Sequence, residues 1–173
     1  MMILFHGTTV KSYHSIAAGI NLSKSKESVD FGRGFYLTKD EVQAIEWVMM
    51  RQHPAVIKFQ FDPKGLKKIE FKEPDERWAR FGVANRLQLD LHRYDYAIGP
   101  MADSKVSRIQ HDFSAGIITF EQAVECIVGH TNGSQVAVLS EKAVRHLQIL
   151  EVRTHGLQER RSRILGLDSS DPS

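Results

Sequence analysis

The apolar residues of this chain come in short runs that turn residues interrupt, and this pattern restricts the fold more than any other feature. No run approaches the roughly 20 residues that a membrane-spanning helix needs. Strand-like runs lie toward both ends of the chain, helical periodicity lies between them, and strict alternation of strand and helix is missing. The sequence therefore predicts an α+β fold with mainly antiparallel sheets.

Periodicity, capping residues and turn residues predict the individual elements. Strands are expected over residues 2–5, 35–38, 55–61, 66–71, 94–98, 135–139 and 149–152. Helices are expected over residues 13–18, 41–53, 75–91, 104–113 and 141–147, and a further helix begins at residue 119. Residues 20–29 form a loop, Asn132-Gly133 a turn, and Gly99-Pro100 ends its strand.

Length and charge restrict the class of protein. The 173 residues predict one domain with a core of its own, which we place at residues 1–152. An Arg-rich and then flexible tail follows at 153–173. The 23 basic and 21 acidic residues leave a net charge of +2, which gives no argument for a nucleic-acid or membrane partner.

The cysteine, the histidines and the N-terminus restrict chemistry and location. Cys126 is the one cysteine, so a disulfide within the monomer and a cysteine zinc cage are excluded. It shares an apolar helical face with Val124 and Ile127, which predicts a core residue. The histidines lack ligand spacing, so no metal is expected. The first apolar run stops at His6 without a basic segment before it, which favours a cytoplasmic protein over one with a secretory signal. A protein exported by a specialised machine would have the same pattern.

Three motifs put polar or aromatic side chains beside glycine at predicted strand ends, where they are able to face a cleft. They are His6-Gly7-Thr8, Phe31-Gly32-Arg33-Gly34-Phe35-Tyr36 and Ser134-Gln135. The second motif is neither a dinucleotide-binding fingerprint nor a phosphate-binding loop, because it lacks the GxGxxG and GKS/GKT patterns.

In order and spacing, these motifs resemble the signature of the ADP-ribosyltransferases of the poly(ADP-ribose) polymerase and diphtheria-toxin type. That signature is His-Gly-Ser/Thr on the first strand, then Phe-Gly-Lys/Arg-Gly followed by an aromatic or aliphatic residue and Tyr, with a second aromatic eleven residues later. Here the second aromatic is Trp47. The chain looks still more like a bacterial family of unknown function with the same fold, which shares the string at residues 30–38 and the strand at 95–100 that ends in Gly-Pro.

The resemblance covers about residues 2–150 and implies two facing antiparallel sheets around an NAD cleft, with inserted helices. It makes NAD⁺ the substrate and requires no metal. The backbone of Gly7 and the Thr8 hydroxyl would bind the nicotinamide carboxamide. Tyr36 and Trp47 would stack on the ring, and His6 would hold a ribose hydroxyl or the adenosine side.

The resemblance also assigns the remaining site residues. Arg33 would face the pyrophosphate, and Phe35 would help to bind the cofactor. Apart from the resemblance, Asn85, Arg86 and Asp95 lie near the strand that ends at Gly99, which makes them candidates for lining the cleft or binding the acceptor. The catalytic set that the resemblance implies is His6, Tyr36 and Gln135.

Two positions depart from the family pattern. Many relatives have a serine where Ala44 stands, and the usual catalytic glutamate is replaced by Gln135. The reaction passes through an oxocarbenium-like transition state. A neutral amide can bond the ribose 2′-hydroxyl without supplying a negative charge, and losing one such electrostatic partner costs roughly 10²–10³ in rate. Gln135 therefore argues for single transfer, for a substrate-assisted reaction or for no catalysis, and it disfavours chain elongation.

We expect transfer of one ADP-ribose from NAD⁺ to a macromolecular acceptor, either protein or nucleic acid. The resemblance implies a bacterial toxin–antitoxin, defence or effector setting, with a small antitoxin protein as a candidate partner and no membrane partner. Three alternatives remain open. They are a non-catalytic NAD or ADP-ribose sensor, an NAD glycohydrolase, and an RNA 2′-phosphotransferase, which would need basic residues clustered around the cleft.

Overall fold

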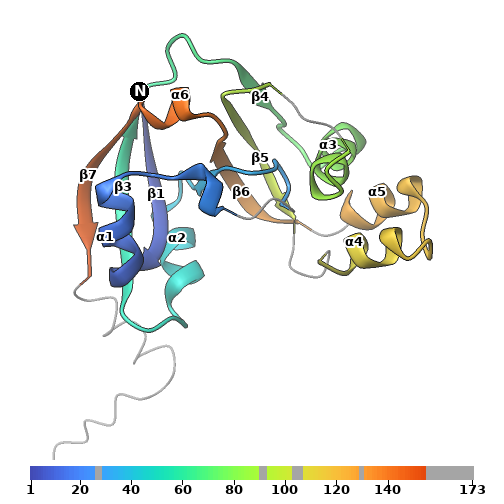
Figure 1. Ribbon diagram of the computed structural model, residues 1–173, viewed down its shortest axis with the longest axis horizontal. Helices are drawn as coiled ribbons and strands as arrows, with labels where there is room; N and C mark the ends of the chain where they lie inside the picture. Colours follow the sequence, from blue (N-terminus) through green and yellow to red (C-terminus); the bar gives the residue numbers. More distant parts are fainter. Residues whose placement is uncertain (26–28, 90–92, 103–106, 129–130, 155–173) are drawn as a thin grey trace, which may run out of the picture. The chain divides into compact units, whose positions relative to one another are not determined.

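The computed structural model describes residues 1–25, 29–89, 93–102, 107–128 and 131–154. The chain divides into two compact units (Figure 1). The first unit contains Met1–Ile20, Leu37–Asp62 and the chain from Leu147, and the second contains Asn21–Tyr36 and Pro63–His146. Each unit is therefore assembled from segments that are far apart in the sequence.

The first unit is built on a three-stranded antiparallel sheet in the order β1-β3-β7. Its strands are β1 (Met2–Thr9), β3 (Pro54–Phe61) and β7 (Leu147–Arg153). The central strand β3 is the most deeply buried of the three, because it has a neighbour on each side. Antiparallel pairing places His6 opposite Ile57 and Gly7 opposite Val56.

Two capped helices complete the first unit. Helix α1 (Val10–Ala18) begins at Thr9, whose side chain accepts a hydrogen bond from the Ser12 amide, and it ends at Gly19. Helix α2 (Glu41–Val48) begins at Asp40, whose carboxylate accepts from the Val42 amide at 2.8 Å. Such caps satisfy amide groups that the first helical turn leaves without partners.

Helix α2 packs against β1 so closely that only glycine fits at position 7. A Cβ there would lie 2.2 Å from the Ala44 carbonyl oxygen and 2.7 Å from a Val48 methyl carbon. Ala44, Val48 and Val56 form the buried cluster at this contact, and Trp47 packs against its edge. Gly7 therefore sets the distance between the helix and the strand.

The second unit is built on a four-stranded sheet in the order β2-β6-β5-β4. Its strands are β2 (Phe35–Leu37), β4 (Lys68–Glu70), β5 (Tyr96–Ala102) and β6 (Thr131–Val138). β5 and β6 are antiparallel, and β4 and β5 are parallel. The chain passes from this unit into the first within β2.

The helices of the second unit cover a core centred on Trp78 and Phe31. They are the short 3₁₀ helix η1 (Leu22–Lys24), α3 (Glu76–Arg86), α4 (Ser107–Ser114), α5 (Phe120–Val128) and α6 (Glu141–Val144). The Trp78 indole donates to the Pro100 carbonyl at 3.0 Å, so this large side chain is buried with its polar atom satisfied.

The predicted α+β class with mainly antiparallel sheets is confirmed. The helix start predicted at residue 119 is confirmed by α5, where Thr119 and Gln122 form a capping box by exchanging hydrogen bonds of 2.8 and 3.2 Å. Among the described residues, no helix has the length and apolar character to span a bilayer.

Several local predictions are wrong, among them the helix predicted over residues 41–53, which ends at Val48. Gly99-Pro100 was predicted to end its strand, but β5 continues through both residues to Ala102. The pairing of β5 with β6 shifts register directly after Pro100, and such an irregularity accommodates a proline within a sheet. The turn predicted at 132–133 lies within β6, where Gly133 adopts a φ of 76°. Helix α6 ends at Val144 instead of reaching residue 147.

The predicted core position of Cys126 is also wrong, because its side chain is exposed. Helix α5 turns Ala123, Val124 and Ile127 into the core, and Cys126 lies outside that stripe. Arg153, where we predicted the tail to begin, is the last residue of β7, and its guanidinium pairs with Glu41 at 2.7 Å. The predicted tail from residue 155 onward lies outside the described residues.

Replacing Gly7 with alanine should destabilise the protein by about 1–3 kcal/mol, because the added methyl group overlaps the backbone of α2. Gly82→Ala is the matched control, since its Cβ would meet only an ordinary contact at 3.7 Å within a helix. That variant should gain about 0.5–1 kcal/mol from helix propensity. Urea unfolding measures both, and equal effects of the two substitutions would contradict this account.

Candidate functional site

The segment Phe31–Tyr36 is closed into a rigid loop by its own hydrogen bonds. The Tyr36 hydroxyl donates to the Gly32 carbonyl at 2.7 Å and accepts from the Phe31 amide at 3.1 Å. The Gly34 amide donates to the Ser25 hydroxyl, and a Cβ on Gly34 would lie 2.9 Å from the Val138 carbonyl. The glycine at position 34 is therefore required by close packing against β6, whether or not the loop binds a ligand.

Burial raises the pKa of the Tyr36 phenol far above its ordinary value, and the Asp30 carboxylate nearby contributes to the rise. The phenol therefore stays protonated at any physiological pH. A protonated hydroxyl is what the loop requires, because it must donate to the Gly32 carbonyl. Tyr36 thus presents an aromatic ring whose hydroxyl is already engaged.

The second unit contains a polar cluster of Asp30, Arg86 and Gln135. Asp30 is its centre and is 4% exposed. Arg86 approaches one carboxylate oxygen with Nε at 2.8 Å and a terminal nitrogen at 2.6 Å. The other oxygen accepts from the Ala102 amide and from Gln135 Nε2, each at 2.8 Å. These four contacts satisfy a buried charge that would otherwise be costly.

Gln135, predicted as a catalytic residue, is 5% exposed near the middle of β6. Its amide nitrogen donates to Asp30 and, at 3.3 Å, to the Pro100 carbonyl. In the described part of the chain no group donates to its Oε1, and no buried side-chain nitrogen or oxygen lacks a partner there. Oε1 therefore contacts solvent.

The structure thus brings Tyr36, Arg86 and Gln135 together around Asp30. Sequence reasoning missed Asp30 as a site residue. The available signal was an acid directly before the apolar Phe31 in a segment that otherwise predicts a turn. Of the other predicted loop residues, Arg33 is exposed and Phe35 is buried.

His6, Gly7, Thr8 and Trp47 belong to the first unit. His6 and Thr8 share the face of β1 opposite to α2, because side chains alternate along a strand. Thr8 is buried as a residue, yet nothing in the described part of the chain bonds its hydroxyl, so that oxygen contacts solvent. Trp47 is partly buried against the contact between α2 and β1.

The backbone of Gly7 faces the edge of the sheet. Phe5 exchanges hydrogen bonds of 2.8 and 2.9 Å with Thr38 at the edge of β1 away from β3. Backbone groups alternate between the two edges of a strand. Gly7, two residues after Phe5, therefore directs its N–H and C=O toward that same edge.

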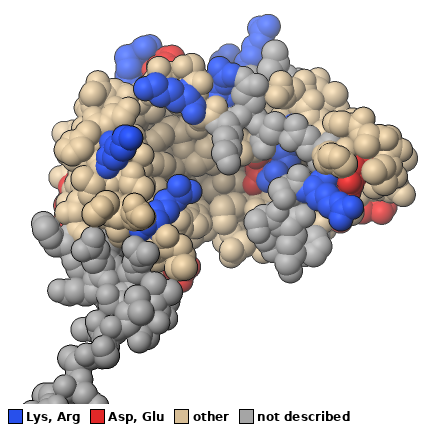
Figure 2. Space-filling model, turned by 60° about the horizontal axis from the view of Figure 1, so that its bottom comes forward, with Lys and Arg blue, Asp and Glu red and all other residues tan. Residues whose placement is uncertain are grey.

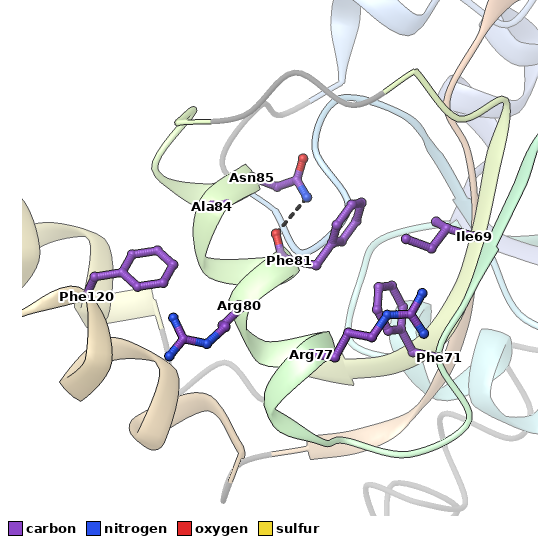
Figure 3. Close-up of a pocket in the computed structure, with 8 residues that line it drawn as sticks. All are labelled: Ile69, Phe71, Arg77, Arg80, Phe81, Ala84, Asn85 and Phe120. Atoms are coloured by element: carbon purple, nitrogen blue, oxygen red, sulfur yellow. Dashed lines mark hydrogen bonds between the residues drawn. The ribbon is translucent and has the colours of Figure 1, made fainter.

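Asn85 lines a pocket of about 390 Å³ on the second unit, shown in Figure 3. Its amide nitrogen donates to the Phe81 carbonyl at 2.7 Å. The lining is aromatic, with two guanidinium groups, and consists of Ile69, Phe71, Arg77, Arg80, Phe81, Ala84, Asn85 and Phe120. Of the predicted site residues, Asn85 alone lines it, so the pocket is separate from the Asp30 cluster.

Asp95, a candidate for the cleft or the acceptor site, forms internal contacts of the second unit. Its carboxylate accepts from the Lys67 amide at 2.8 Å and from the Ser140 hydroxyl at 2.7 Å. Lys142 approaches at 3.5 Å. The hydrogen bond from the Lys67 amide and then that from Ser140 lower the pKa of Asp95. These contacts tie β5 to α6.

Charge at the surface bears on the nucleic-acid alternatives. On the face drawn in Figure 2, the described lysine and arginine side chains stand in separate groups, with acidic side chains beside some of them. The side chains drawn in colour on that face therefore give no support for the RNA 2′-phosphotransferase alternative. Within the described ranges, no group of three or more histidine, cysteine or acidic side chains is arranged to hold a metal ion.

The fold and the cluster define an α+β protein with a buried polar centre beneath a glycine-rich loop. The chain belongs to the family described as "Protein of unknown function (DUF3990)", whose model matches residues 2–149. The match includes every residue predicted for the site. No curated protein and no solved structure matches the chain.

Asp95→Asn should lower stability by about 1 kcal/mol at pH 7, because a neutral acceptor replaces a charged one. A carboxyl with a lowered folded-state pKa stabilises the protein above its ordinary pKa of 3.8, and that contribution disappears as the pH falls through the lowered value. The difference between the two proteins should therefore shrink as the pH falls below 3.8. Thermal unfolding at about pH 7 and pH 3 measures it, and a difference that does not change with pH would contradict the assignment.

Proposed function

We propose that this protein transfers a single ADP-ribose from NAD⁺ to a macromolecular acceptor and releases nicotinamide. Two mainly antiparallel sheets with inserted helices are what an ADP-ribosyltransferase fold requires, and the motif resemblance points to the same fold.

The observation that carries the proposal is the backbone of Gly7. It directs an N–H donor and a C=O acceptor toward the edge of β1 that is turned away from β3. A carboxamide such as that of nicotinamide presents the complementary acceptor and donor. The Thr8 hydroxyl, on the next residue, contacts solvent and adds a further hydrogen-bonding group. A planar amide is therefore a fitting ligand for this strand edge.

The aromatic residues supply the second requirement. Tyr36 is held by its hydroxyl at the end of the rigid loop, so its ring has little freedom left to lose when a ligand binds. Stacking on a planar ring adds about 0.5–1.5 kcal/mol beyond the area buried. Trp47 would supply the other ring face in the proposed complex, and His6 would bind the ribose or the adenosine side.

The third requirement is a group that acts on the ribose while the bond to nicotinamide breaks. Gln135 Oε1 would accept a hydrogen bond from the ribose 2′-hydroxyl and hold the sugar in position. Cleavage leaves positive charge on the ribose, and a neutral amide stabilises that charge less than a carboxylate would. This chemistry supports transfer of one unit rather than growth of a polymer.

The neutrality of Gln135 also favours a second candidate function, the binding of NAD or ADP-ribose without turnover. In that case the protein would be a sensor. The two functions differ in one measurable product, since only the enzyme releases nicotinamide. Hydrolysis of NAD⁺ is the third outcome, and it would release nicotinamide and ADP-ribose with no acceptor present.

The test is release of nicotinamide from labelled NAD⁺, with and without a bacterial lysate, compared with His6→Ala. We expect release that depends on the lysate, with label entering a macromolecule, and loss of both in the variant. Release without lysate would identify a glycohydrolase. Binding measured by calorimetry without any release would identify the sensor, and absence of both binding and release would refute the proposal.

Thr8→Val tests the carboxamide site more finely, because it keeps the shape of the side chain and removes its hydroxyl. Loss of one hydrogen bond should raise the KM for NAD⁺ roughly 3- to 10-fold. Thr131→Val, at an exposed position on β6, is the matched control and should leave the KM unchanged. Equal KM values for all three proteins would remove Thr8 from the site.

A further inference from the structure

We propose that the buried Asp30–Arg86 ion pair determines both the orientation of the Gln135 amide and the need for an amide at this position. Asp30 thereby acts as a positioning residue, and Gln135 presents its oxygen to a ligand hydroxyl. The inference takes its ligand from the proposed function, whereas its geometry stands on the described contacts alone.

The orientation follows from the chemistry of Asp30. Its carboxylate is paired with Arg86 through two nitrogens at 2.8 and 2.6 Å, so it carries a charge and can only accept hydrogen bonds. The Pro100 carbonyl can only accept as well. Both groups contact the same end of the Gln135 side chain. That end must be the NH₂ group, and the opposite end must be the oxygen.

The orientation matters because the two ends of a glutamine side chain have nearly the same shape. An unfixed amide would turn either its oxygen or its NH₂ group toward a ligand. The NH₂ group repels the positive charge that develops on a ribose as its glycosidic bond breaks. Asp30 removes this ambiguity, since turning the amide over would place its oxygen 2.8 Å from a carboxylate oxygen.

The ion pair also increases the acceptor strength of Gln135. Asp30 lies between Arg86 and Gln135, so the negative end of the pair faces the amide NH₂ group. Hydrogen bonds in a chain polarise one another, and a carboxylate bound to the NH₂ group shifts electron density toward Oε1. Part of the negative charge that a catalytic glutamate would supply is thereby delivered through the amide.

The same geometry excludes a glutamate at position 135. An ionised carboxylate there would meet Asp30 at 2.8 Å and the Pro100 carbonyl at 3.3 Å, and neither can donate to it. Within the described ranges, the charged or titratable groups with an interaction given for Asp30 are Arg86, which is already engaged, and the phenol of Tyr36. The ADP-ribosyltransferases that the motifs resemble usually have a glutamate where this chain has Gln135. The presence of Gln135 is therefore coupled to the presence of Asp30.

Gln135→Glu tests the coupling through stability, which requires no ligand. At pH 8 its urea midpoint should fall well below that of the wild type. The loss should shrink toward pH 5, because a protonated carboxyl can donate to Asp30 as the amide did. Gln148→Glu, the same change at an exposed position on β7, should show no such pH-dependent loss. A Gln135→Glu protein as stable as the wild type at pH 8, or a loss that is equal at both pH values, would overturn the proposal.

Asp30→Asn tests the positioning role. NMR should show that the side-chain NH₂ resonance of Gln135 moves and that its protons exchange faster with water. The kcat for nicotinamide release should fall about 10²-fold with less than about 3-fold change in the KM for NAD⁺. An unchanged Gln135 resonance would refute the positioning role even if kcat fell. If the wild type neither binds nor cleaves NAD⁺, the proposed function fails, and the stability and NMR measurements still decide the coupling.

Discussion

A charged carboxylate that is almost completely buried is the constraint on which the second unit depends. Asp30 leaves water only because Arg86, the Ala102 amide and Gln135 replace the hydrogen bonds that water would make. Breaking a buried ion pair by removing one partner typically costs about 3–5 kcal/mol. The loop before β2, the end of α3 and strands β5 and β6 must therefore all reach the same point, and the polar cluster fixes how they meet.

The first unit depends on a different constraint, the absence of a side chain at Gly7. Close approach of α2 to β1 buries Ala44 and Val48, and it leaves the backbone of Gly7 in a strand whose free edge meets only Thr38 in the described residues. The two units thus depend on different physical constraints. Close packing against α2 explains Gly7 in the first unit, and a buried ion pair explains the contacts of Gln135 in the second.

The parts of the site that were predictable are those whose signals are local. His6-Gly7-Thr8 and Phe31–Tyr36 stand out because glycine and aromatic residues fall at strand ends. Cys126 was misassigned because Val124 and Ile127 predict an apolar face without showing how wide it is, and the core takes only a narrow stripe of α5. Asp95 was predicted to line the cleft or bind the acceptor, and the sequence did not show that its carboxylate accepts hydrogen bonds from Ser140 and the Lys67 amide, which come from distant parts of the chain.

The sequence by itself determined the α+β class, most helix starts and the positions where glycine is required, because capping, periodicity and backbone freedom act between near neighbours. Only the tertiary structure decided what Asp30 and Gln135 do. The partners of Asp30 lie 56, 72 and 105 residues away along the chain, so no local pattern relates them. Gln135 at first suggests a weakened catalytic position. In the folded protein its amide nitrogen donates to the buried Asp30 carboxylate, a contact that no local sequence pattern indicates.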